Sequence, residues 1–262
     1  MIRYLRLYAY FLRFSFSKAM EFRLDFSFRI LMDIIYYIVN ILFFEILFMH
    51  TPLIEGWNLE QMKIFVAGYL LVDSISMTIF SSNMWWMPYF INKGELDYYL
   101  IRPVSPLFFL SLRDFSANSF LNLLIATGYF IYSLVNYSAP FSMWEVLLLC
   151  LLLFNGVLIY YCCQMIMVLP VFWTQSAKGF MDLFYAMGHA MERPDKIYRG
   201  VLKILFTTLI PFTLIASFPA RLFLEKFDWM TFLHLVVVSV LFWIVMLKLW
   251  AKGLKTYSSA SS

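Results

Sequence analysis

The sequence predicts an all-helical protein that crosses a membrane several times. Of its 262 residues, 63% are hydrophobic and only 14% are charged, whereas a soluble domain is nearer half apolar and a quarter charged. Six runs carry few charges and are near or above the roughly 17 to 25 residues that a spanning helix needs. We therefore treat residues 1–262 as one membrane domain and place its six spans at residues 28–48, 62–84, 107–135, 144–173, 200–218 and 230–250.

Basic residues are concentrated in alternate connections between these spans. The N-terminal segment, the loop 88–106, the segment 174–199 and the C-terminal tail, with their flanks, hold seventeen Lys and Arg, and the other connections hold three. Because Lys and Arg favour the cytoplasmic side, both termini, the loop 88–106 and the segment 174–199 are expected in the cytoplasm, the last as a helix and loop. The net charge of +4 follows from this asymmetry, and it gives no reason to expect a nucleic-acid partner.

Residues 1–24 have the pattern of a helix that lies flat on the membrane surface. Arg3, Arg6 and Arg13 fall on one helical face, opposite an apolar face. Such a helix directs its bases toward lipid phosphates. The alternative is an ordinary basic flank of the first span.

Several helix starts are marked in the sequence. Ser105-Pro106 supplies an N-cap and a proline at the first helical position of the third span. Ser142 and Glu145 have the spacing of a capping box at the start of the fourth span. Asp228 is placed to cap the sixth.

The loop 88–106 is the charged insert between two apolar runs. The two acids, two bases and two prolines of residues 92–106 cannot lie in hydrocarbon, where their polar groups would be unpaired. We expect a short helix at residues 95–101 that a partner subunit grips, with Leu96 and Leu100 in apolar contact and charged side chains fixing the register. The full set is Gly94, Glu95, Leu96, Asp97, Leu100, Arg102 and Pro103. The alternative is a tight polar turn that only reverses the chain.

Polar residues also recur along two of the spans. Such residues at membrane depth usually face a cavity or the interior of a helix bundle. They could line a transport pathway or the seam between two chains, and they could equally be hydrogen-bonding contacts between helices. The two stripes are Asp73, Ser74, Thr78 and Ser82 in the second span, and Asp114, Asn118 and Asn122 in the third.

No catalytic motif is found. The phosphate-binding pattern G-x-x-x-x-G-K-[ST] is absent, and no Gly is followed directly by Lys. The three His residues lie in different segments without partner ligands at metal spacing. We therefore expect neither an enzyme nor a metal site in this chain.

Three sequence elements resemble one transporter family. The loop resembles the cytoplasmic loop of type-2 ABC-transporter permeases of about this length with six spans. Two further segments resemble the fifth span and the C-terminal tail of that family. The residues that carry the resemblance are Gly94-Glu95-Leu96-Asp97, Leu100-Ile101-Arg102-Pro103-Val104-Ser105-Pro106, Ile210-Pro211-Phe212, Phe218-Pro219-Ala220 and Gly253-Leu254-Lys255-Thr256-Tyr257-Ser258-Ser259-Ala260-Ser261.

The resemblance implies a permease subunit of an ATP-driven exporter in the bacterial inner membrane. It implies a second permease chain, identical or a sister, and separate cytoplasmic ATPase subunits that use ATP and Mg, so that this chain binds no cofactor itself. The loop 88–106 would be the coupling element, and the cargo would be amphipathic or hydrophobic. The alternative is a proton- or ion-coupled secondary transporter that uses intramembrane carboxylates such as Asp33, Glu45, Asp73 and Asp114.

Overall fold

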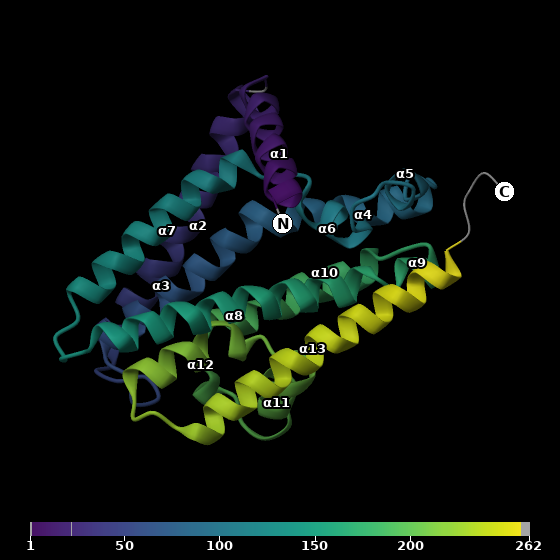
Figure 1. The fold of residues 1–262 in the computed structure, drawn as a ribbon. Helices are drawn as coiled ribbons and strands as arrows, with labels where there is room; N and C mark the ends of the chain where they lie inside the picture. Colours follow the sequence, from purple (N-terminus) through teal and green to yellow (C-terminus); the bar gives the residue numbers. More distant parts are fainter. Residues whose placement is uncertain (1, 22, 258–262) are drawn as a thin grey trace.

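The computed structural model describes residues 2–21 and 23–257 and has no strand within them. The side chain of Arg3 and residues 258–262, on which parts of the expectations above fall, lie outside the described parts. Figure 1 shows long helices packed side by side, with α1 across one flank and α5 at one end. The helices are α1 (Ile2–Glu21), α2 (Arg23–His50), α3 (Leu59–Ser76), η1 (Met77–Ser81), α4 (Ser82–Asn92), α5 (Asp97–Leu100), α6 (Pro106–Leu112), α7 (Ala117–Val135), α8 (Met143–Val168), α9 (Val171–Thr174), α10 (Lys178–Gly188), η2 (His189–Glu192), η3 (Asp195–Ile197), α11 (Gly200–Ile204), η4 (Leu205–Leu209), α12 (Thr213–Leu224) and α13 (Trp229–Thr256).

The predicted all-helical membrane architecture is confirmed. Five helical segments within the described residues are long and apolar enough to cross a membrane, or six if a sharply bent pair is counted as one span. The predicted helix starts are also present: Ser142 and Glu145 form a capping box at α8, and Asp228 accepts hydrogen bonds from two backbone N–H groups of α13. An unpredicted capping box, Asn58 with Gln61, begins α3.

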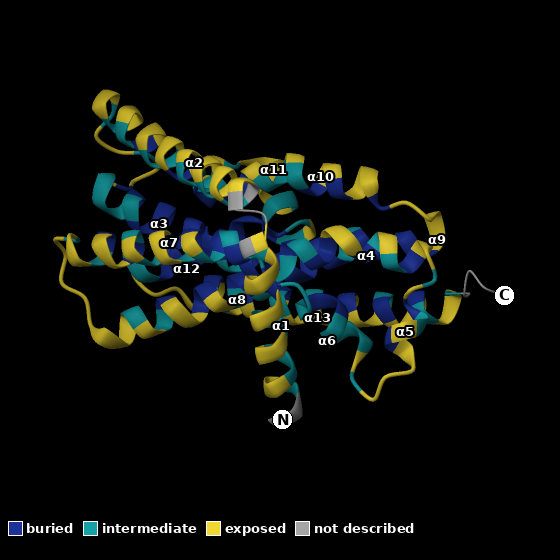
Figure 2. Ribbon diagram, turned by 90° about the horizontal axis from the view of Figure 1, so that it is seen from above, coloured by how far each residue is buried: buried dark blue, intermediate teal, exposed yellow. Residues whose placement is uncertain are grey.

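The core is formed by α3, α8 and α12. Gly156 of α8 lies so close to α12 that a Cβ there would be 2.1 Å from the carbonyl oxygen of Ile215. Gly68 of α3 similarly faces Leu153 of α8. Figure 2 shows buried residues along α3 and α8 and exposed ones along much of α2. Small residues allow close packing of helices in a bilayer.

The third predicted span, 107–135, is divided in the structure. Ser105 caps α6 as expected, but α6 ends at Leu112, and the spanning helix α7 begins only at Ala117. The non-helical link 113–116 finds its hydrogen-bond partners on neighbouring helices, since the backbone N–H of Ser116 donates to the carbonyl of Thr78 at 2.9 Å. Polar backbone in a bilayer needs such partners.

The position of the segment 174–199 differs from the expected one. It was expected to stay at one end of the bundle, but α10 packs along α8, with the rings of Phe184 and Tyr160 5.3 Å apart. Beyond α10, Lys196 pairs with Glu225 at 2.5 Å and Arg199 with Glu55 at 3.6 Å. Glu55 and Glu225 belong to the connections α2–α3 and α12–α13, at the end of the bundle opposite α5. Residues 178–199 therefore run from the α5 end of the bundle to the opposite end.

The predicted fifth span, 200–218, is therefore not the fifth crossing. Pro211 does break it, as expected: α11 and η4 meet α12 at 98°. Lys196 and Arg199 hold the start of this pair near the end that also carries Glu225, which follows α12. These contacts indicate that the pair is a re-entrant segment that enters and leaves at the same end. Residues 178–199, in place of the bent pair, then make the sixth crossing beside the five long helices and are the fifth in chain order.

A buried ion pair fixes this arrangement. Asp195 is fully buried, accepts a hydrogen bond from Ser217 at 2.7 Å and pairs with Arg221 at 2.7 Å. Arg221 also contacts Thr231 at the start of α13. A buried charge is tolerated only when it is paired and hydrogen-bonded, so the connection before α11 has a defined seat on α12.

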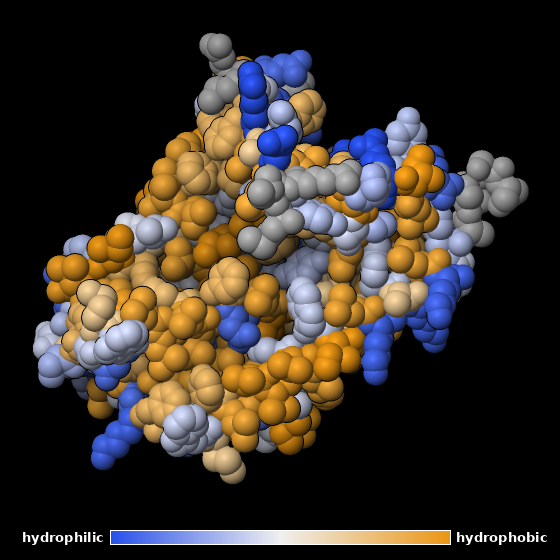
Figure 3. Space-filling model, viewed as in Figure 1, coloured by the Kyte–Doolittle hydropathy of each residue, from blue (hydrophilic) through white to orange (hydrophobic). Residues whose placement is uncertain are grey.

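Polar and apolar surfaces separate along the molecule. Figure 3 shows apolar side chains over much of α7, α12 and α13, while hydrophilic residues gather over α1 and at the end that carries α5 and the C-terminal part of α13. With Arg193, Lys196, Arg199 and Lys203 moved to the opposite end, thirteen Lys and Arg remain on the α5 side against seven. The basic asymmetry is thus smaller than the sequence suggested.

The close approach of α8 and α12 predicts a strong position effect for glycine. Gly156→Ala should destabilise the protein by about 1–3 kcal/mol, because the added methyl would overlap backbone. Gly128→Ala, in α7 with nothing within 4 Å, should be neutral or slightly stabilising. Thermal unfolding in detergent measures both, and equal midpoints for the two variants would contradict this packing.

The crossing of residues 178–199 predicts which side of the membrane each connection faces. In a background without the native cysteines, Arg199→Cys and Lys226→Cys should react with an impermeant thiol reagent from one side, and Lys93→Cys from the other. All three positions are exposed. Reaction of Arg199→Cys from the same side as Lys93→Cys would show that 174–199 stays at one end.

Candidate functional site

Two features of the structure are candidates for function: the exposed α5 end and a cavity beside α7. The α5 end is made by a sharp turn after α4. Gly94 has φ +76°, a left-handed conformation that glycine adopts without strain. Leu96 N–H then bonds back to the carbonyl of Phe90 at 3.2 Å, and the single turn of α5 follows.

Leu96 does not have the role expected from the sequence. It was expected to contact a partner, but its side chain is 0% exposed and packs in a cluster with Met84 of α4, Val168 of α8 and Trp250 of α13. Burial of this side chain anchors the turn to three long helices. The exposed apolar residues are instead Leu100 and two that the sequence analysis did not select, Tyr98 at 66% and Ile101 at 81%.

The charged residues of the turn also have neighbours within the chain. The Arg102 guanidinium lies over the rings of Tyr98, at 5.6 Å, and Phe109, at 5.5 Å. Asp97 lies beside Tyr257 near the C-terminal end of the described chain, and burial together with this carboxylate raises the pKa of Tyr257. Glu95, Arg102 and Pro103 are exposed, so the turn presents a mixed apolar and charged surface.

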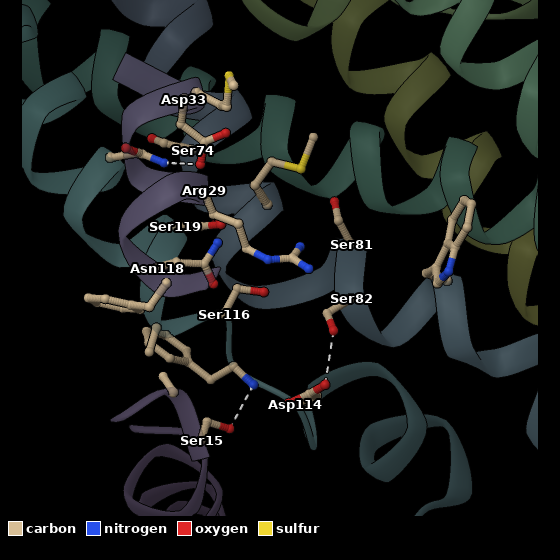
Figure 4. Close-up of a pocket in the computed structure, with 18 of the residues that line it drawn as sticks. Ser15, Arg29, Asp33, Ser74, Ser81, Ser82, Asp114, Ser116, Asn118 and Ser119 are labelled. Carbon is tan, nitrogen blue, oxygen red and sulfur yellow. Dashed lines mark hydrogen bonds between the residues drawn. The ribbon is translucent and has the colours of Figure 1, made fainter. Parts of the chain in front are cut away.

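The second feature is a cavity of about 1060 Å³. It lies between α1, α2, the continuous α3–η1–α4 segment, the link 113–116 and α7, and Figure 4 shows how polar side chains from these elements face it. Six of the seven predicted polar stripe residues line it: Asp73, Ser74, Ser82, Asp114, Asn118 and Asn122. Two stripes that are far apart in the sequence therefore meet at one cavity.

The seventh stripe residue, Thr78, is buried next to the cavity. Its hydroxyl donates to the carbonyl of Ser74 at 2.6 Å, in the π-helical turn η1, and its own carbonyl accepts from Ser116. π-Helical turns inside longer helices are frequent at functional sites. Thr78 does not line the cavity, but it bonds Ser74 and Ser116, which do.

Sequence reasoning missed the residue that holds the link in place. Asn83 of α4 donates its side-chain amide to the carbonyl of Asp114 at 2.7 Å and accepts from the N–H of Asp114 at 2.9 Å. Ser82 donates to the Asp114 carboxylate at 2.9 Å, and Ser15 of α1 accepts from Phe115 N–H at 3.0 Å. Figure 4 shows the Ser82 and Ser15 bonds on either side of the link.

Other lining residues come from α2. Asp33 accepts a hydrogen bond from the Asn122 side chain, and Arg29, Tyr36 and Tyr37 face the same space. Tyr36 also bonds Glu192 of η2 at 3.0 Å. Only tertiary structure brings α2 to this cavity, so no spacing in the sequence could identify these residues as one set.

α1 is held against the rest by aromatic contacts. The ring of Tyr4 lies 4.7 Å from that of Phe108, and the ring of Phe11 lies 5.0 Å from that of Phe109. Arg6 and Arg13 are exposed on other faces of the helix. This placement leaves both bases accessible to lipid headgroups, which stays a prediction.

Comparison with known families gives the class of the protein. Residues 34–261 match the family described as "ABC-2 family transporter protein". The chain belongs to this family and is a multi-pass permease of an ABC transporter. No curated protein and no solved structure matches the chain.

The two hydrogen bonds between the Asn83 side chain and the backbone of Asp114 give a stability prediction. Asn83→Ala should lower the free energy of unfolding by about 1–3 kcal/mol, because two backbone groups of the link lose their partner. Asn136→Ala is the control, since that side chain is exposed and bonds only its own helix. Chemical unfolding in detergent compares the two, and equal stability would show that the link does not depend on Asn83.

Proposed function

We propose that this permease moves an amphipathic or hydrophobic substrate outward, driven by separate ATPase subunits that bind the α5 end. In this proposal the α5 end and both termini are cytoplasmic, the protein sits in a bacterial inner membrane, and it works with a second permease chain, identical or a sister. ATP and Mg belong to the ATPase subunits. The membership of the ABC-2 family supports an ATPase partner in general.

One observation carries this proposal: an exposed, partly apolar turn stands at the far end of a continuous helical rod. The segment Leu59–Asn92 has 34 residues, which is about 51 Å at 1.5 Å per residue. A bilayer core is about 30 Å thick, so roughly 20 Å of the rod extends beyond it. α5 is therefore held where a water-soluble subunit could reach it.

The packing of the turn supports transmission of force rather than passive docking. Tyr98 and Ile101 face outward, while Leu96 is locked between α4, α8 and α13. Close-packed interiors transmit displacement because they deform little. Movement of α5 would therefore move α4, and α4 holds the link 113–116 through Asn83.

The cavity is the proposed entry site for the substrate. It is bordered by the element that α5 would move and by α1 and α2. Trp85 and Trp86, both exposed in part, add an aromatic edge to its polar wall. A space with both polar and aromatic lining suits an amphipathic ligand.

The second candidate function, a secondary transporter, is favoured by the carboxylates at membrane depth. Asp33 and Asp73 both line the cavity, and ion-coupled carriers use such groups. Transport in proteoliposomes distinguishes the two functions. Dependence on ATP and a co-purified ATPase supports the proposal, whereas transport that follows a proton or ion gradient without ATP supports the carrier.

The outward face of α5 predicts a specific binding defect. Ile101→Ser should reduce co-purification of the cognate ATPase subunit by about tenfold, because exposed apolar anchors dominate such contacts. Val201→Ser is a matched control, as both side chains are 81% exposed but Val201 lies on the re-entrant segment. Unchanged ATPase association and transport in Ile101→Ser would overturn the role of α5.

A further inference from the structure

The most buried charged residue that lines the cavity is Asp73 of α3. Its side chain is only 8% exposed, yet it lines the cavity. It makes no hydrogen bond or ion pair with any residue in the described parts of the chain, unlike Asp114 and Asp33, which accept from Ser82 and Asn122. A carboxylate at this depth without a partner is costly.

The surroundings of Asp73 increase the negative potential. The carboxylates of Asp33 and Glu192 are both close enough to interact with it electrostatically. Tyr36 and Tyr37 line the cavity, as do Met32 and Met77. The deep end thus combines two carboxylates with aromatic rings, and aromatic faces attract cations.

The basic residues that line the cavity are Lys18 and Arg29, and Arg29 is near enough to Asp33 to interact with it electrostatically. Figure 4 shows the Arg29 side chain extending toward Ser81 and Ser82, away from Asp33. Lys18 of α1 lines the cavity and also the adjoining space near Trp86 and Asp114. The cavity therefore has the carboxylates of Asp33 and Asp73 toward one end, and Lys18, the Arg29 guanidinium and the hydrogen-bonded Asp114 toward α1 and α4.

We propose that this deep end binds an organic cation, with Asp73 as its counter-ion and the rings of Tyr36 and Tyr37 against the charged group. The ligand is an amphiphile that carries an ammonium or similar onium group. Its polar remainder reaches the hydroxyl and amide groups of Ser116, Asn118 and Ser119. The proposal rests on the proposed function in that it makes this cation the transported substrate.

The test uses two ions of the same shape and opposite charge. Purified full-length protein in nanodiscs is equilibrated with tetraphenylphosphonium or with tetraphenylborate, and binding to empty nanodiscs is subtracted. Wild type should bind the phosphonium saturably and the borate not saturably. Asp73→Asn should weaken phosphonium binding at least about tenfold, the loss expected when one charge of a buried pair is removed.

Two further variants keep the test independent of folding. Asp73→Glu retains the charge and should retain most of the binding, and Asp182→Asn removes an exposed acid of α10 outside the cavity and should bind as wild type. Absence of saturable phosphonium binding, preference for the borate, or equal binding by wild type and Asp73→Asn would each overturn the cation site.

The binding measurement needs no ATPase, so it is separable from the proposed function. Loss of ATPase association in Ile101→Ser with no cation binding would reject the cation site alone. Cation binding that depends on Asp73, in a protein whose transport ignores ATP, would reject the ATP-driven function and leave the binding site in place.

Discussion

The two hydrogen bonds between the Asn83 side chain and the backbone of Asp114 are the interaction on which the rest of the structure depends. They hold a non-helical link between α6 and α7, whose backbone groups would be costly to leave without partners. Because Asn83 belongs to α4, the link is tied to the same helix that ends in the α5 turn. The link also forms part of the cavity beside α7, because Asp114, Phe115 and Ser116 line it.

The two ends of the helix bundle differ in how their connections are held. At the α5 end, Leu96 is buried and Ile101 is exposed, so one side of the turn is fixed and the other is available. At the opposite end, the buried pair of Asp195 with Arg221 and the pair of Lys196 with Glu225 tie the re-entrant segment to the fifth crossing. In the proposed function, movement imposed at α5 would therefore act against an anchored opposite end of the bundle.

Much of the architecture could be predicted from the sequence because local signals determine it. The capping box of Ser142 with Glu145 and the break at Pro211 are visible in a few neighbouring residues. The fifth crossing could not be found in this way. Its helix α10 is short and is followed by Glu192 and Arg193, so it looks like a polar connection. The Glu192 carboxylate accepts hydrogen bonds from Tyr36 and Tyr69, which lie on helices distant in the sequence.

For the candidate sites too, local spacing predicts some features and tertiary packing decides the others. Helical spacing put Asn118 and Asn122 on one face of α7, and both line the cavity. That the stripe of Asp73 faces the same cavity follows only from the tertiary structure. The four-residue spacing predicted that Leu96 and Leu100 both contact a partner. Leu96 is buried instead, because it packs in a cluster with residues of α8 and α13. Asn83 carried no signal, since its role depends on a link that the sequence did not reveal.

The most direct test measures cavity opening in the complex with the ATPase subunits. Asn118→Cys, a lining position, is labelled with a water-soluble thiol reagent with and without ATP, using ATPase subunits that bind but do not hydrolyse it. We expect ATP to change the labelling rate, and Asn83→Ala to abolish this change while ATP binding persists. An ATP-dependent change of equal size in Asn83→Ala would contradict it.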